Sequence, residues 1–172
     1  MKELNLRNIT MMALVACWFI QIGGQVFALV AVDSALVAAP PRSFAMLQGE
    51  YRYDSSAFWS TVPPLTSVLL IIALVANWKT GRRKLLLLAL TLFMVIALMS
   101  MLYLEPVFDE IKAIGFSDEV DPALQSRAAN WYAADWAAWC LALVGGLILL
   151  LALIRPVTAE PNRVDPDSNR GV

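Results

Sequence analysis

The sequence predicts an all-α membrane protein, a four-helix bundle that forms one domain over residues 1–155. Of its 172 residues, 59% are hydrophobic and only 16% are charged, whereas a soluble domain carries about 25% charged residues and roughly 45–50% apolar ones. The mean hydropathy is +0.65. Most apolar residues fall in four stretches of 20 to 24 residues, at 11–32, 58–78, 85–104 and 131–154. These stretches are the predicted membrane spans.

The length of these stretches predicts helices and not strands. A helix rises about 1.5 Å per residue, so roughly 20 residues cross the ~30 Å hydrocarbon core. Spanning strands would need only about 10 residues and would alternate in polarity. The first stretch follows Lys2 and Arg7, as in a signal peptide, but its 22 residues exceed the roughly 7–15 residues of a cleavable apolar region. We therefore expect it to be retained as a span.

The placement of charge predicts that both termini are cytoplasmic. The link between the second and third spans contains Lys79, Arg82, Arg83 and Lys84, and short loops rich in lysine and arginine stay on the cytoplasmic side. In this orientation nine of the 13 basic residues lie on the inner side and ten of the 14 acidic residues on the outer side. We expect a multi-pass protein of the cell membrane, meaning a plasma membrane or a bacterial inner membrane. Its tail, residues 156–172, is expected to be disordered in the cytoplasm.

The composition disfavours several classes of function. The net charge is −1 and histidine is missing from the sequence, which argues against a nucleic-acid partner and against imidazole catalysis. Cys17 and Cys140 both lie within spans and form no Cys-x-x-Cys pair, so we expect neither a metal site nor a bound cofactor. The serine–histidine–aspartate set and the glycine-rich phosphate loop are also missing.

The fourth helix is predicted to be longer than its apolar part. Asp121 followed by a proline is a strong helix start, and nothing interrupts the helix before Arg155. A helix of about 33 residues is near 50 Å long, so its first turns would stand outside the membrane. Small residues recur at every fourth position along it, at Asn130, Ala134, Ala138, Ala142 and Gly146. Because small residues let helices approach closely in lipid, we expect this ridge to pack against Gly23, Gly24 and Ala28 of the first helix.

A neighbouring ridge of the fourth helix carries the candidate site. Arg127, Trp131, Asp135 and Trp139 also repeat every four residues and are expected to share one face. An ionisable residue within a span is costly and usually faces the bundle interior or a wet cavity. We therefore predict an outward-facing polar and aromatic pocket, with Arg42, Tyr51, Arg52, Arg127, Trp131, Asp135 and Trp139 as ligand-binding residues. The alternative is a carboxylate at the membrane interface that water still reaches, beside a belt of aromatic residues.

Other polar residues lie near the same depth. Gln21 and Gln25 are one turn apart in the first span, and amides in lipid find partners across helix interfaces; packing is the main interpretation and ligand contact the alternative. Glu105, followed by a proline, is expected to end the third span, with a short interfacial helix beyond it. If the protein is an enzyme, Asp135 and Glu105 are the candidate catalytic bases. The first outer loop, residues 33–57, is expected to be partly structured.

Three segments give the chain a family resemblance. They are Met46-Leu-Gln-Gly-Glu-Tyr-Arg-Tyr-Asp-Ser-Ser56 with Phe58-Trp59, then Asn77-Trp78, and then Asp121-Pro-Ala-Leu-Gln-Ser-Arg127 with Trp131. The layout over residues 10–155 resembles the small four-helix membrane proteins grouped with anthrone oxygenases. The resemblance implies a four-helix bundle whose ligand site lies near the outer membrane face. In members with an assigned activity, it implies oxygenation of a phenolic polyketide without a metal or a flavin.

Three functions are consistent with these features. The first is a four-span bundle that binds a small lipophilic or aromatic ligand in the outward-facing pocket. The second is a cofactor-free oxygenase of the anthrone type, with Asp135 or Glu105 as the base. The third is an accessory subunit of a membrane complex. The expected partners are the lipid bilayer, the small ligand, and either a second copy of the chain or a membrane partner subunit.

Overall fold

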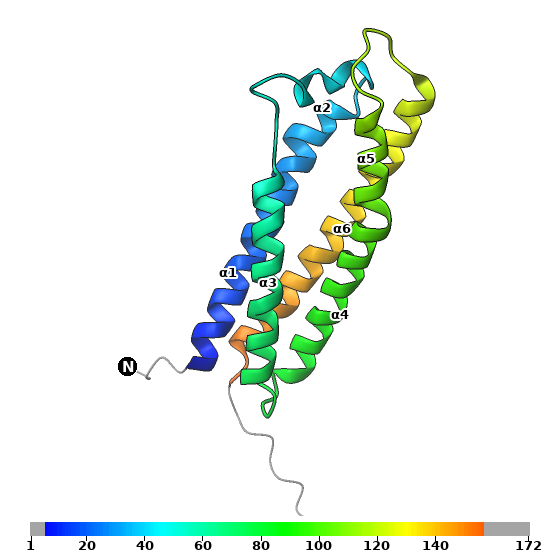
Figure 1. The fold of residues 1–172 in the computed structure, drawn as a ribbon. Helices are drawn as coiled ribbons and strands as arrows, with labels where there is room; N and C mark the ends of the chain where they lie inside the picture. Colours follow the sequence, from blue (N-terminus) through cyan, green and yellow to red (C-terminus); the bar gives the residue numbers. More distant parts are fainter. Residues whose placement is uncertain (1–5, 157–172) are drawn as a thin grey trace, which may run out of the picture.

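The computed structural model describes residues 6–156, which form a bundle of four long helices (Figure 1). The elements in order are α1 (Leu6–Phe27), a π-helical turn (Ala28–Asp33), α2 (Ser34–Leu36), a 3₁₀ helix (Arg42–Leu47), α3 (Ser56–Ala76), α4 (Arg83–Met99), a second π-helical turn (Ser100–Leu104), α5 (Glu105–Ala113) and α6 (Pro122–Ile154). The π-helical turns join α1 to α2 and α4 to α5. Four continuous helices of 31, 21, 31 and 33 residues result, each long and apolar enough to cross a membrane. The predicted all-α fold, with four helices long and apolar enough to span a membrane, is confirmed. All but the first residue of the predicted disordered tail, 156–172, lies outside the described residues.

The first and third long helices are longer than the predicted spans. We expected Glu105 and Pro106 to end the third helix, but it continues through α5. In a regular α-helix the ring of Pro106 would clash with the carbonyl of Leu102, and the π-helical turn at Ser100–Leu104 widens the backbone at this point. The helix ends just before Gly115, whose φ of 76° is the left-handed conformation typical of a glycine beyond a helix end. The interfacial helix that we expected to be separate is therefore part of the third long helix.

The fourth long helix, α6, begins where the sequence predicted. The Asp121 carboxylate accepts hydrogen bonds from the backbone N–H groups of Ala123 (2.8 Å) and Leu124 (3.3 Å). These are two of the N–H groups that a helix start leaves without a partner in the helix. The helix then runs for 33 residues to Ile154, which is the predicted length.

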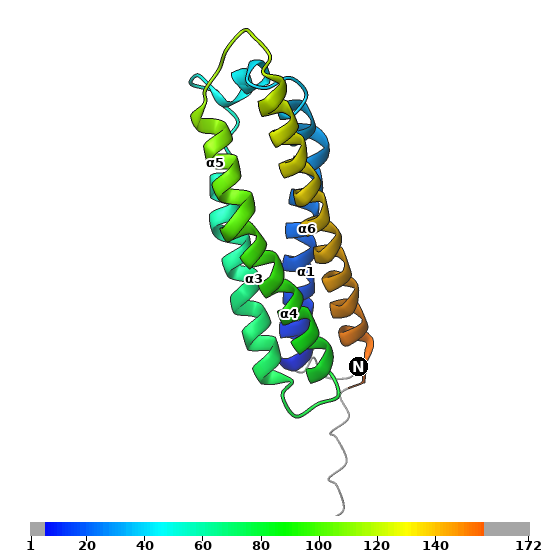
Figure 2. The ribbon, with the colours of Figure 1, turned by 90° about the vertical axis from the view of Figure 1, so that its right-hand side faces the viewer.

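The four long helices form a ring in which α1 packs against α3 and α6, and α4 packs against α6 and α3 (Figures 1 and 2). The start of α1 and the end of α6 lie beside the α3–α4 link, residues 77–82. We call this end of the bundle the basic end. The opposite end holds the segments 37–55 and 114–121, and we call it the acidic end. A hydrophobic core with contributions from all four long helices fills the half near the basic end, and it includes Met11, Leu14, Trp18, Leu70, Leu86 and Leu149.

The predicted contact between the first and fourth helices is present, but the small residues that make it come from α6. A Cβ atom built on Gly145 would lie 2.6 Å from Cζ2 of Trp18, so only glycine fits beneath this ring. The Trp18 Nε1 atom donates to the carbonyl of Ala142 (2.9 Å). On α1, Gly24 instead faces the Phe58 ring of α3, and Gly23 has open space around it. The two helices therefore pack together as predicted, but the contact joins large α1 side chains to small α6 residues, and Gly23 and Gly24 take no part in it.

A buried guanidinium group closes the basic end. Arg82 is only 3% exposed, although it lies in the link that the sequence assigned to the cytoplasmic surface. Its Nη1 atom donates to Oδ1 of Asn8 (2.8 Å), and its Nη2 atom donates to the carbonyls of Leu153 (3.0 Å) and Arg155 (2.7 Å). These acceptors belong to the first turn of α1 and the end of α6. Arg82 thus joins both ends of the chain's helical part to the α3–α4 link, and it supplies donors to carbonyls that a helix end leaves unpaired.

Packing at the acidic end leaves α3 out. A second hydrophobic core joins α2, the 3₁₀ helix, the π-helical turn before α5, α5 itself and the first half of α6, through Leu36, Phe44, Leu104, Ile111, Leu124, Ala128, Trp131 and Ala138. Among the described residues, α3 contributes nothing to this core. The first turns of α3 contact α1, where the Phe58 ring lies against Gly24, but because α3 takes no part in this core, space remains between these turns and the other two long helices.

Candidate functional site

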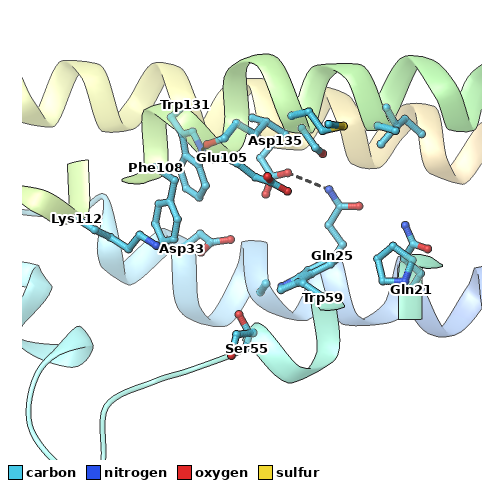
Figure 3. A pocket seen from close by; sticks show the side chains of 18 of the residues that line it. Gln21, Gln25, Asp33, Ser55, Trp59, Glu105, Phe108, Lys112, Trp131 and Asp135 are labelled. Atoms are coloured by element: carbon cyan, nitrogen blue, oxygen red, sulfur yellow. Dashed lines mark hydrogen bonds between the residues drawn. The ribbon is translucent and has the colours of Figure 1, made fainter. Parts of the chain in front are cut away.

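A cavity of about 490 Å³ occupies this space (Figure 3). Residues of all four long helices and of the loop before α3 line it. Its aromatic lining consists of Tyr53, Trp59, Phe93, Phe108 and Trp131, and its polar lining of Gln21, Gln25, Asp33, Asp54, Ser55, Ser56, Ser100, Glu105, Lys112 and Asp135. The volume and the mixture of apolar walls with a few polar groups are typical of small-molecule sites.

A hydrogen bond between α1 and α6 crosses one side of the cavity. The Nε2 atom of Gln25 donates to Oδ1 of Asp135 at 2.9 Å (Figure 3). Gln25 is 7% exposed and Asp135 is half-buried, so this contact is largely shielded from solvent. The expectation that a glutamine of the first span finds a partner across a helix interface is confirmed for Gln25. This contact fixes the position of the Asp135 side chain at the cavity wall.

Two further polar residues of the first long helix, Asp33 and Gln21, line the cavity. Asp33 lies at the end of the π-helical turn and is 9% exposed, and its carboxylate accepts no hydrogen bond from the part of the chain that the structure describes. The Oε1 atom of Gln21 is buried and also has no hydrogen-bond partner among these residues. Buried polar groups are nearly always hydrogen-bonded. The Asp33 carboxylate is therefore positioned to bind a molecule in the cavity, whereas the Oε1 atom of Gln21 is enclosed by protein atoms.

Trp131 connects the cavity wall to the π-helical turn. Its Nε1 atom donates to the carbonyl of Leu104 (2.9 Å), a carbonyl within the turn where the regular α-helical pattern is interrupted. The indole ring also stacks on Phe108 of α5, with 4.8 Å between ring centroids and 14° between planes. Above Phe108 lies the Nζ atom of Lys112, 4.5 Å from the ring centroid. The wall on this side is therefore a stack that joins α6 to α5.

The loop before α3 forms the rim of the cavity. Its Asp54 carboxylate accepts a hydrogen bond from the backbone N–H of Ser56 (2.9 Å), and hydrogen bonds from Ser56 hold the pKa of Asp54 below its ordinary value. The backbone N–H of Tyr53 donates to the carbonyl of Met46 (3.0 Å). This contact ties the rim to the 3₁₀ helix. Asp54 therefore adds a fixed negative charge at the entrance.

The predicted ridge of α6 divides among three surroundings. Trp131 and Asp135 line the cavity. Trp139 lies between α6 and α1, where its Nε1 atom donates to a backbone carbonyl of α1 at 3.3 Å. Arg127 forms an exposed ion pair with Glu110 of α5. The reason is geometric: each step of four residues exceeds a full turn by about 40°, so the ridge rotates by roughly 120° between Arg127 and Trp139.

The predicted residues of the first loop lie outside the cavity lining. Arg42, in the 3₁₀ helix, and Arg52 are exposed, and Tyr51 is 94% exposed. The residues that follow them, Tyr53 and Asp54, line the cavity instead. Of the two candidate bases, Asp135 and Glu105 both belong to the lining. The structure thus joins the two acids with Trp131, and it separates them from the three arginines that we expected nearby.

Several lining residues were missing from the sequence prediction. Phe108 and Lys112 were assigned to a segment beyond the third span, because the proline after Glu105 was read as a helix end. Asp33 was assigned to the first outer loop; it was a detectable signal, since it is an ionisable residue that directly follows an apolar stretch of helical length. Trp59 lay within a predicted span, but nothing in the sequence indicated which way it faces.

Comparisons of the chain with family models, with curated proteins and with solved structures found no match to any of them.

Proposed function

We propose that this protein is an integral membrane four-helix bundle that binds a small lipophilic or aromatic molecule in the cavity at its acidic end. The observation that carries the proposal is the cavity itself, about 490 Å³ in volume, with five aromatic side chains and a few polar side chains, Asp33 and Asp135 among them, in its lining. Apolar walls would supply affinity and the few polar groups would fix orientation.

We further propose that the basic end faces the cytoplasm of a plasma membrane or a bacterial inner membrane. Lys79 and Lys84 are exposed beside the α3–α4 link, and Arg83 is partly exposed there. Short basic links of this kind remain on the cytoplasmic side. In this orientation the cavity rim, with Asp54, opens on the outer side.

A cavity-filling substitution tests the binding proposal. Ala97 of α4 lines the cavity, so a phenylalanine at this position places a ring in the ligand's volume. We expect Ala97→Phe to weaken binding of the neutral aromatic probe pyrenebutanol by about tenfold or more, the equivalent of roughly 1.4 kcal/mol or more. Trp59 and Trp131 in the lining allow binding to be measured by energy transfer from tryptophan to pyrene, with the protein in phosphatidylcholine nanodiscs and empty nanodiscs as the blank.

The neighbouring residue provides the matched control. Leu98 is 51% exposed on the outside of the bundle, and Leu98→Phe adds a ring on the lipid-facing side of the same helix turn. It should leave pyrenebutanol binding unchanged. Equal binding by the wild type and Ala97→Phe, or no saturable binding above empty nanodiscs, would contradict the proposal.

A second candidate function uses the same cavity. The Asp135 carboxylate is held at the cavity wall by Gln25, and this fixed position favours a role as a base in a cofactor-free oxygenase of the anthrone type. The two candidates differ in one readout: an oxygenase consumes dioxygen when a phenolic anthrone is added to the purified protein, and a binding protein does not.

A further inference from the structure

We infer that the cavity selects a cationic amphiphile, an organic amine whose ammonium group sits between Asp33 and Asp135 while its aromatic or apolar body lies against the rings of the wall. The inference rests on the proposed function, since it specifies the chemical class of the ligand that the cavity would bind.

The first line of support is the charge of the cavity. Asp33 and Asp135 approach it from two different helices, and among residues 6–156 neither is joined to a lysine or arginine by an ion pair. Asp135 has one hydrogen bond, from the neutral amide of Gln25, and Asp33 has none from the described residues. Carboxylates withdrawn from water are costly unless a positive charge accompanies them. A ligand cation would supply the charge that the described chain does not.

Lys112 is the one cationic side chain in the described lining, and its charge is already engaged. Its Nζ atom lies 2.7 Å from Oδ1 of Asp109 and over the ring of Phe108. Asp109 is one turn away on the same helix, so this ion pair is local to α5. The ammonium group of Lys112 therefore leaves Asp33 and Asp135 without compensation, while Asp54 and Glu105 add further acidic groups at the lining.

The second line of support is the chemistry of the walls. Trp59, Trp131 and Phe108 all belong to the cavity lining (Figure 3), and one face of Trp131 is stacked on Phe108. Aromatic faces attract ammonium groups as well as apolar bodies.

The same features disfavour an anionic ligand. A carboxylate or phenolate in the cavity would meet the like charges of Asp33 and Asp135, and like charges at short range repel in a medium of low dielectric constant. Arg42, Arg52 and Arg127, the arginines that could have offset this repulsion, all lie outside the lining. Charge therefore discriminates among ligands with the same apolar body.

Three probes that share one ring system and chain length, and differ only in their head group, test the inference at neutral pH. They are pyrenebutylamine, pyrenebutanol and pyrenebutyrate, measured in phosphatidylcholine nanodiscs against empty nanodiscs. We expect the amine to bind about tenfold more tightly than the alcohol, the difference that one charge-assisted hydrogen bond provides. The carboxylate should bind more weakly than both.

Two charge-removing variants locate the effect. In Asp33→Asn and in Asp135→Asn the ratio of amine to alcohol affinity should fall to about threefold or less, because one negative charge is lost at the head-group position. The Oδ1 atom of an asparagine can still accept the hydrogen bond of Gln25, so Asp135→Asn should fold normally. Asp118→Asn removes the same charge from the exposed loop after α5 and should leave the ratio unchanged.

The outcomes separate the two proposals. Suppose that pyrenebutanol binds and that Ala97→Phe weakens its binding, but that the amine binds no more tightly than the alcohol. The cation inference then fails and the binding function stands. A carboxylate that binds more tightly than the amine also overturns the inference, as does an amine advantage that Asp118→Asn reduces as much as the two cavity variants do. If none of the three probes binds above the blank, the proposed function fails, and the inference fails with it.

Discussion

Replacing Arg82 with methionine should lower the free energy of unfolding by about 3 kcal/mol. Methionine fills much of the same volume but supplies no donor, so Oδ1 of Asn8 and the carbonyls of Leu153 and Arg155 lose the hydrogen bonds that now satisfy them. Hydrogen bonds from a charged donor contribute about 1.5–3 kcal/mol each and do not add fully. The change is measured as a shift of the midpoint in SDS-driven unfolding, or as a lower Tm in mild detergent.

Arg83→Met is the matched control, because it removes the same charge from the adjacent position. Arg83 is only half-buried, and its guanidinium lies 5.4 Å from the centroid of the Trp78 ring. A cation–π contact of this kind contributes about 0.5–1 kcal/mol, so the shift should be several times smaller. Equal shifts for the two variants would show that the basic link stabilises the protein through charge alone and not through the buried hydrogen bonds of Arg82.

Truncating Trp131 to alanine should cost about 3–5 kcal/mol, the range for a buried aromatic residue in a packed core. Trp131 is 6% exposed; its ring stacks on Phe108, and its Nε1 atom binds the Leu104 carbonyl in the π-helical turn. The substitution removes both the packing and the hydrogen bond that hold α5 against α6. The expected loss of stability is read from the same unfolding midpoint.

A graded substitution separates the two contributions of Trp131. Trp131→Phe restores a ring that can stack on Phe108 but leaves the Leu104 carbonyl without its donor, so a smaller loss of about 1–3 kcal/mol is expected. Trp78→Ala, at a position that is 49% exposed near the basic end, should change stability little. If Trp131→Ala proves as mild as Trp78→Ala, the stack does not hold the acidic end together.

The number and type of the elements were predictable because their causes are local. The four apolar stretches all reach the length that a bilayer requires, and the cap at Asp121 is a contact between residues two and three positions apart. The end of the third long helix could not be predicted in this way. A proline after Glu105 ordinarily argues for a helix end, and a π-helical turn that accommodates it leaves no pattern that we recognised in the sequence.

The sequence predicted the level of the candidate site along the helices, but not which side chains meet there. The costly placement of an ionisable residue in a span identified Asp135, and the same argument applies to Asp33. Which side chains meet depends on how each helix is rotated, and the ridge from Arg127 to Trp139 drifts away from a single face. The position of the first outer loop also depends on long-range packing, because Phe44 anchors the loop in the second core. The rim residues Tyr53 and Asp54 follow this anchor in the chain and line the cavity, while Tyr51 and Arg52 remain exposed.

The few charged residues inside the bundle lie at its two ends and have different roles there. One cation, Arg82, is buried to close the basic end, and two acids, Asp33 and Asp135, line a cavity near the acidic end. The bundle therefore has a firmly joined end and an incompletely packed end. We place function at the second, where α3 leaves the core.

Native mass spectrometry of the full chain, extracted from its own membrane in mild detergent, tests the central proposal most directly. The proposal predicts one small-molecule adduct on the wild type and on Leu98→Phe, and its loss from Ala97→Phe, in which the added ring occupies the cavity. The contrary result is an adduct retained equally by Ala97→Phe, or a wild-type protein that carries no small molecule and takes up none of the pyrene probes.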